Sequence, residues 1–134
     1  MEAQAQHYQQ KLAYELDAAD LYEAVRTGEP VVIVDARQEA AYQAEHIPGA
    51  ISLGHRLMNE ESTRSLDRSK VYVTYCDGIG CNASTKGALK LTQLGFHVKE
   101  LMGGLDWWKR DGYATAGEAA TPGVAIGTGV TCAC

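Results

Sequence analysis

The chain has 134 residues, of which 46% are hydrophobic and 22% are charged, and its formal net charge is −5. Length and composition fit one globular domain with a single core. The acidic balance, with no cluster of lysine and arginine, argues against nucleic-acid binding, because neutralising phosphates requires clustered cations.

The first residues of the chain bear on its location. Residues 1–21 are polar and acidic and contain no apolar segment of the kind found in signal peptides. No apolar run approaches the ~18 residues of a membrane span. We therefore expect a cytoplasmic protein that does not associate with membranes. Disulfides are rare in the cytoplasm, so the four cysteines favour reactive thiols or metal ligands. A secreted protein with two disulfides is the less favoured alternative.

The pattern of apolar residues and turn residues predicts alternating strands and helices. In chain order we expect an N-terminal extension (1–13), a short strand and a helix (15–30), a buried strand (31–37), a short helix (38–46), a turn and a short strand (47–53), an irregular charged segment (54–70), a strand (70–76), a helix (82–96), a strand (97–104), a short helix (105–113) and a flexible Gly-, Ala- and Thr-rich tail (114–134).

This alternation predicts a parallel sheet with helices on both faces. In such sheets the functional groups lie at the carboxyl ends of the strands. Asp35 and Cys76 both occupy that position. His55 lies in the irregular segment, which we expect to border the same edge.

The sequence YCDGIGCN, residues 75–82, places Cys76 between a strand end and a helix start. The backbone amides of a short glycine-containing loop can form an anion-binding concavity. The helix N-terminus adds about 0.3–1 kcal/mol for a nearby anion. Both effects favour a thiolate, or the anion of a persulfide, over a neutral thiol. A buried core cysteine without reactivity is the alternative.

Two longer motifs carry a resemblance to a known family. VVIVDARQEAAYQAEHIPGAISL resembles the first signature of the rhodanese (sulfurtransferase) family, with Asp-x-Arg after a strand and His-Ile-Pro-Gly-Ala. VYVTYCDGIGCNASTKGALKLTQLGFHVKELMGGLDWWKRDGY resembles the second, which contains the catalytic cysteine. The resemblance spans residues 14–113, and the signatures occur in the family's order and spacing.

The resemblance implies a rhodanese-like α/β fold, with a five-stranded, mainly parallel sheet and helices on both faces. It implies that Cys76 takes a sulfane sulfur from thiosulfate or a persulfide, holds it as a persulfide, and passes it to cyanide or a thiol. No cofactor or metal is implied.

The resemblance also assigns supporting roles. It assigns the amide cradle to Asp77, Gly78, Ile79, Gly80, Cys81 and Asn82. Asp35 is expected to brace this loop through backbone hydrogen bonds. Arg37 is expected to pair with a carboxylate, Glu45 or Glu39.

Two residues depart from the patterns of related proteins. Asp77 is acidic and should repel the thiosulfate dianion, with Lys86 able to offset it, so a persulfide donor is the alternative to thiosulfate. Phosphatases of this fold need an arginine six residues after the cysteine to clamp phosphoryl oxygens. Asn82 stands there, which excludes that activity.

The other cysteines leave alternatives open. Cys81 is an inert small residue, a resolving thiol that forms a disulfide with Cys76, or a second sulfur acceptor. Cys132 and Cys134 form a mobile tail that relays sulfur, binds a metal, or does neither. The alternative to an enzyme is a redox-sensing or sulfur-carrier module that uses Cys76 and Cys81. The sequence does not indicate the oligomeric state.

Overall fold

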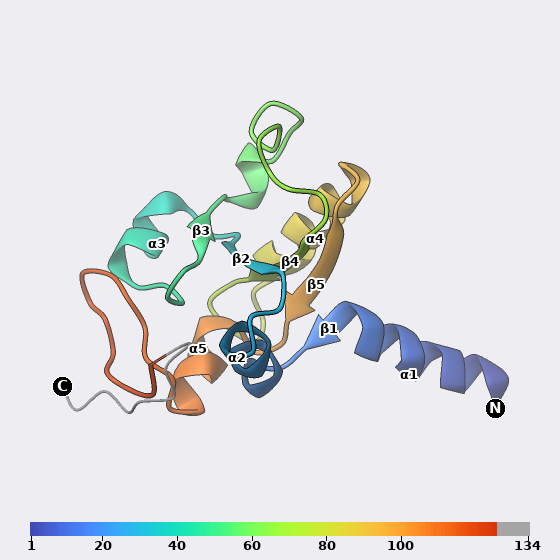
Figure 1. Ribbon diagram of the computed structural model, residues 1–134, viewed down its shortest axis with the longest axis horizontal. Coiled ribbons are helices and arrows are strands. Elements are labelled where there is room, and N and C mark those ends of the chain that lie inside the picture. Colours follow the sequence, from blue (N-terminus) through green and yellow to red (C-terminus); the bar gives the residue numbers. More distant parts are fainter. Residues whose placement is uncertain (126–134) are drawn as a thin grey trace.

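Residues 1–125, which the computed structural model describes, contain one sheet of five parallel strands in the order β1-β5-β4-β2-β3 (Figure 1). The strands are β1 (Glu15–Leu16), β2 (Val31–Asp35), β3 (Ile51–Ser52), β4 (Val71–Tyr75) and β5 (His97–Leu101). The prediction of a five-stranded, mainly parallel sheet is confirmed, since every pairing among these strands is parallel.

Helices cover both faces of this sheet, as predicted. They are α1 (Glu2–Tyr14), α2 (Ala18–Arg26), α3 (Glu39–Ala44), the 3-10 turn η1 (His55–Leu57), α4 (Ala83–Gln93) and α5 (Gly104–Arg110). α2 and α5 pack on one face, where Leu21 and Trp108 belong to one cluster of buried side chains. α4 packs on the opposite face, where Leu91 joins Tyr72 and Phe96 in a second cluster. No helix among the described residues is long and apolar enough to cross a membrane.

The strands β2 and β4 are buried on both faces because both sets of alternating side chains are apolar. Ile33 and Val73 face the cluster that contains α2 and α5. Val34 and Tyr72 face the cluster that contains α4. The two strands pair in parallel over their whole length, so they end at the same edge of the sheet.

The helix α1 is exposed along its whole length and extends away from the sheet (Figure 1). α2 begins after Asp17, whose carboxylate accepts a hydrogen bond from the Asp20 amide at 2.8 Å. This cap fixes the start of the helix that follows β1.

The first part of the C-terminal tail is packed against the domain, where the sequence led us to expect flexibility. Residues 116–119 bond the backbone at the end of α3, and Val124 bonds the backbone of Gly112 and Ala114. The carboxylate of Glu45 accepts hydrogen bonds from the hydroxyls of Thr115 and Thr121. Lys109 on α5 donates to the other oxygen of Glu45 at 3.0 Å. One carboxylate therefore joins α5 and the tail, a long-range contact that composition does not reveal. Cys132 and Cys134 lie outside the described residues, and their roles stay predictions.

The contacts of Glu45 predict a pH-dependent contribution to stability. Burial raises the pKa of this carboxyl, but the hydrogen bonds from Thr115, Thr121 and Lys109 outweigh burial and lower it below the ordinary value of 4.5. A depressed pKa stabilises the fold above the unfolded pKa, and this stabilisation is lost as the pH falls through the folded pKa. Glu45→Gln should therefore reduce the free energy of unfolding at pH 7 by about 1–3 kcal/mol.

Urea unfolding of both proteins at pH 7 and at acidic pH measures this effect. The difference between wild type and Glu45→Gln should shrink as the pH falls below the ordinary value of 4.5. Glu61→Gln, at an exposed position, serves as the matched control and should change little. An equal loss in both variants would contradict the assignment.

Candidate active site

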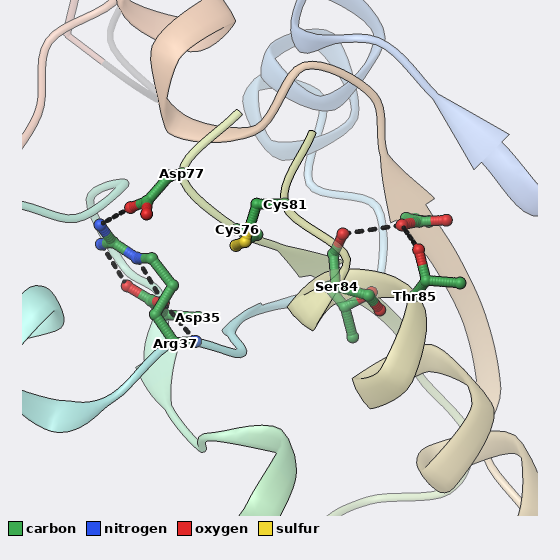
Figure 2. Close-up of a disulfide and its surroundings, with 9 residues drawn as sticks. Asp35, Arg37, Cys76, Asp77, Cys81, Ser84 and Thr85 are labelled. Carbon is green, nitrogen blue, oxygen red and sulfur yellow. Dashed lines mark hydrogen bonds and ion pairs between the residues drawn. A yellow bond between two sulfur atoms is a disulfide. The ribbon is translucent and has the colours of Figure 1, made fainter. Parts of the chain in front are cut away.

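The carboxyl ends of β2 and β4 bring the two predicted site residues together. Asp35 is in register with Tyr75, and Cys76 follows Tyr75 directly. The amide of Ala36 donates to the carbonyl oxygen of Tyr75 at 3.0 Å, which continues the pairing just beyond Asp35. The sequence placed Asp35 and Cys76 at one sheet edge, and the structure does the same (Figure 2).

The side chain of Asp35 is fully buried and forms an ion pair with Arg37. Arg37 Nε donates to Asp35 Oδ1 at 2.9 Å, and Nη2 donates to Oδ2 at 2.7 Å. The hydroxyl of Tyr75 donates to Oδ2 at 2.9 Å. Both carboxylate oxygens are therefore hydrogen-bonded, which a buried charge requires.

The guanidinium of Arg37 also reaches the cysteine loop and the end of α3. Nη1 donates to Asp77 Oδ1 at 2.8 Å (Figure 2). Nη2 donates to the backbone carbonyl of Glu45 at 2.6 Å. Burial by itself lowers the pKa of Arg37, but the hydrogen bonds to Asp35 and Asp77 outweigh it and hold that pKa above its ordinary value. Arg37 is thus a permanent cation at this edge.

Two expectations about this cluster are wrong in detail. Arg37 pairs with the carboxylates of Asp35 and Asp77, and not with those of Glu45 or Glu39. The carboxylate of Glu45 is engaged by the C-terminal tail, and that of Glu39 by Ser52 and Gln43. The carboxylate of Asp35 does not bond the backbone of the cysteine loop among the described residues, and reaches it through Arg37.

The cysteine loop is held from the other side by the N-terminus of α5. The amide of Leu105 donates to the Cys76 carbonyl at 2.9 Å, and the amide of Asp106 donates to the Asp77 carbonyl at 2.8 Å. This close approach depends on Gly104, because a β-carbon there would overlap the Cys76 carbonyl oxygen and lie 2.9 Å from the Gly78 nitrogen. The sequence signal for this contact is the pair of glycines after β5.

The loop amides are arranged differently from the full cradle that we expected. The amide of Cys81 donates to the Gly78 carbonyl at 3.3 Å and is therefore not free in this conformation. The other cradle positions have amides without an acceptor among the described residues, and these are Asp77, Gly78, Ile79, Gly80 and Asn82. Unpaired amides in a short loop are what an anion cradle requires. The role of each position stays a prediction.

Cys76 and Cys81 are joined by a disulfide, with Cα atoms 6.2 Å apart (Figure 2). Of the three alternatives for Cys81, this is the one that the structure contains. Cys76 is only 2% exposed, whereas Cys81 is half-buried. A carboxylate oxygen of Asp77 and the two sulfur atoms lie within 4.8 Å of one another. These three groups are possible metal ligands only in the reduced protein, because a disulfide sulfur is no thiolate.

A cavity of about 520 Å³ opens beside the disulfide. It is lined by Cys76, Asp77 and Cys81 on one side and by Arg37, Ser52 and the η1 segment on the other. His55 borders it, as expected for the irregular segment. Burial lowers the pKa of His55, and the charges of Lys86 and Lys90 lower it further, so its imidazole is neutral at pH 7.

The first turn of α4 is fixed by a residue that sequence reasoning missed. A carboxylate oxygen of Glu100 on β5 accepts hydrogen bonds from Ser84 Oγ at 2.7 Å and from Thr85 Oγ1 at 2.6 Å (Figure 2). Thr74 Oγ1 on β4 donates to the Ser84 carbonyl at 3.0 Å. These bonds hold the helix that ends the cysteine loop against both strands. The strand β5 has the sequence HVKEL, with three polar residues among five, so its pattern does not single out Glu100.

Fold and site together define a class of protein: a parallel α/β domain with a cysteine loop at the carboxyl end of its central strand. The sequence profile of the rhodanese-like domain matches residues 17–111. The chain belongs to the rhodanese-like domain family.

Known proteins of this family resemble the chain closely. It is 36% identical over 81 residues to a thiosulfate sulfurtransferase, GlpE, of Coxiella burnetii, a match that covers 59% of this chain and 72% of the relative. The crystal structure of the BH2092 protein of Bacillus halodurans has a TM-score of 0.85 and 42% identity, and the match covers 89% and 88% of the two chains. The rhodanese-like domain of Alr3790 from Anabaena has a TM-score of 0.70 and 31% identity over 78% and 80%.

The two ion pairs of Arg37, one with the buried Asp35 and one with the exposed Asp77, should contribute unequally to the free energy of unfolding. Arg37→Met leaves the charge of Asp35 buried without a partner and should lower the free energy of unfolding by about 3–5 kcal/mol. Asp77→Asn breaks only an ion pair whose Asp77 side chain is 72% exposed, and should cost at most about 1 kcal/mol. Denaturant titration of both variants measures the two values. Similar losses would show that Asp77 and not Asp35 holds Arg37 in place.

Proposed function

We propose that this protein is a single-domain sulfurtransferase and that Cys76 is its nucleophile. The observation that carries the proposal is the position of Cys76 at the end of β4, lining the cavity beneath a loop with unpaired amides. The activity named for the Coxiella burnetii relative, thiosulfate sulfurtransferase, supports the same chemistry.

The reaction proceeds in two half-reactions. The Cys76 thiolate attacks the sulfane sulfur of the donor, and the donor's remaining fragment leaves with the electron pair of the broken bond. The resulting persulfide is stabilised by the loop amides and the start of α4. An acceptor, cyanide or a thiol, then attacks the outer sulfur and restores the Cys76 thiolate. The chain's own side chains supply this chemistry, with no cofactor.

Catalysis requires the reduced form of the loop, because a sulfur in the Cys76–Cys81 disulfide cannot attack a donor. Dithiol reductants that open such disulfides are characteristic of the cytoplasm, which we propose as the location. Cys81 is more exposed than Cys76, so the reductant can reach the sulfur atom of Cys81.

The charges around the cavity favour a persulfide over thiosulfate as the donor. Arg37, the cation closest to the loop, is already paired with Asp35 and Asp77. The carboxylate of Asp77 lies within 4.8 Å of both sulfur atoms and repels a dianion. Lys86, which we expected to offset Asp77, does not pair with it among the described residues, and its charge acts on His55.

A second candidate function is a redox sensor that toggles between dithiol and disulfide. The disulfide between Cys76 and Cys81 is the observation that favours it. A sensor of this kind needs no sulfur donor, so the two functions are separated by whether Cys76 acquires sulfur.

Mass spectrometry tests the sulfurtransferase directly. The protein is reduced, freed of reductant, and exposed without oxygen to thiosulfate or to glutathione persulfide. A variant with Cys81→Ser, Cys132→Ser and Cys134→Ser should gain one sulfur atom on Cys76 and lose it to cyanide as thiocyanate. Cys76→Ser in the same background is the matched control and should gain none. A Cys76 that stays unmodified with every donor would refute the proposal.

Donor choice should respond to the charge at position 77. Asp77→Asn removes the repulsion of a dianion and frees one edge of the Arg37 guanidinium. We expect kcat/KM for thiosulfate to rise about fivefold, which corresponds to about 1 kcal/mol for one exposed charge. The same constant for an organic persulfide that has no other charged group, and is therefore at most a monoanion, should rise less. Equal effects on both donors would contradict an electrostatic role for Asp77.

A further inference from the structure

The pair of cysteines at the cavity raises the question of what becomes of a persulfide on Cys76. Cys81 lies five residues further on, and the bond from its amide to the Gly78 carbonyl turns the loop back towards the strand end. The Cα separation of 6.2 Å is within the range that disulfides require. Cys81 therefore reaches the inner sulfur of any persulfide formed on Cys76 by local adjustment alone.

We propose that Cys81 is a resolving thiol that discharges the Cys76 persulfide as hydrosulfide, so that the protein reduces sulfane sulfur to sulfide. This inference rests on the sulfurtransferase function proposed above. In this reaction Cys81 is a catalytic residue. The second substrate is a dithiol reductant instead of a sulfur acceptor.

The steps balance in atoms and electrons. With thiosulfate, the Cys76 thiolate attacks the sulfane sulfur, the S–S bond breaks, and sulfite leaves with the electron pair. The Cys81 thiolate then attacks Sγ of Cys76, the persulfide S–S bond breaks, and the outer sulfur leaves as hydrosulfide with the proton that Cys81 had given to solvent. Two protein thiols are oxidised to a disulfide, and one sulfane sulfur is reduced to sulfide. A dithiol then supplies two electrons and two protons to regenerate Cys76 and Cys81.

Proximity favours this internal attack over an external acceptor. Cys76 is 2% exposed, so a bulky thiol approaches it poorly, whereas Cys81 is held on the same short loop. An internal thiol in suitable geometry acts at an effective concentration far above that of a dissolved one. Attack on the inner sulfur yields the same Cys76–Cys81 disulfide that the structure contains, whereas attack on the outer sulfur would move the persulfide to Cys81.

The charge of Asp77 acts in the same direction. A carboxylate oxygen within 4.8 Å of both sulfur atoms disfavours a stored persulfide anion, since two negative charges repel at this distance. Arg37 binds that carboxylate but shares its guanidinium with Asp35 and the Glu45 carbonyl. Release of the anion as hydrosulfide relieves the repulsion, so the loop is suited to a transient persulfide.

The relative exposure of the two sulfur atoms indicates how the disulfide is reopened. A dithiol reductant meets the half-buried Cys81 before the buried Cys76. Attack on Cys81 forms a mixed disulfide there and releases the Cys76 thiolate towards the loop amides and the start of α4, which stabilise it as a leaving group.

A single-turnover experiment tests the proposal. Full-length protein with Cys132→Ser and Cys134→Ser is reduced, freed of reductant, and mixed without oxygen with an equimolar amount of thiosulfate or glutathione persulfide. We expect about one hydrosulfide released per chain, a loss of both thiols, and a mass lower by two hydrogen atoms. The Cys81→Ser form of the same protein should keep the added sulfur on Cys76 and release hydrosulfide at least about tenfold more slowly.

A second readout uses cyanide, which competes for the outer sulfur. The protein with Cys81 should convert little of the bound sulfur to thiocyanate, and the Cys81→Ser protein should convert most of it. Cys81→Ala is the second variant, and thermal unfolding of both variants checks that the fold is retained. Residue 81 is half-buried in a loop, and serine and alanine are close to cysteine in size, so we expect either variant to fold.

The outcomes separate this inference from the function on which it rests. If the Cys81→Ser protein takes up sulfur and the protein with Cys81 also keeps a stable persulfide on Cys76, the resolving role of Cys81 is refuted. The proposed sulfurtransferase function is then still supported. Transfer of the added sulfur to Cys81 also overturns it, in favour of a relay. Failure of Cys76 to acquire sulfur in every variant overturns both proposals. Hydrosulfide release that depends on Cys81 supports both.

Discussion

The buried ion pair between Asp35 and Arg37 is the interaction on which the arrangement of the site depends. Taking both charges out of water is unfavourable, and the pair persists because every buried side-chain nitrogen and oxygen atom among the described residues has a hydrogen-bond partner. Through Arg37 the pair connects the end of β2, the carbonyl that ends α3 and Asp77 of the cysteine loop, and through Tyr75 it connects β4. Seven hydrogen bonds converge on one guanidinium and one carboxylate, so a change at either partner propagates to the position of Cys76.

Much of this arrangement could be predicted from sequence because it follows from local pattern. The apolar runs that end at Asp35 and at Cys76 predict two buried parallel strands, and parallel strands end at one edge. The glycines after β5 predict a tight turn, and Gly104 allows the backbone of α5 to approach the cysteine loop. These features need no knowledge of distant contacts.

The remainder depends on long-range geometry that a one-dimensional pattern does not contain. Four carboxylates lie near Arg37 in the sequence or the fold, and the choice among them is decided by the register of β2 and β4 and not by spacing. The apolar side chains of residues 114–125 are small, mostly alanine, and glycines and threonines stand between them, so composition predicts flexibility. Their order comes from hydrogen bonds to Glu45, about 70 residues earlier in the chain. Such a contact becomes visible only once the tail is placed beside α3.

Two sets of groups around the cysteine loop have opposite effects on a negative charge at Cys76. The unpaired amides and the start of α4 favour an anion at Cys76, whereas the carboxylate of Asp77 disfavours one within 4.8 Å. A loop built only to store a persulfide would carry the first set of groups without the second. Arg37 pairs with Asp77 and Asp35 at once, so its single positive charge is shared between two carboxylates and does not fully offset the negative charge of Asp77. Cys81 is already within bonding distance of Cys76, so in the proposed mechanism the sulfur is released by a group of the loop itself, and the sulfur of the half-buried Cys81 is the atom that the reductant attacks.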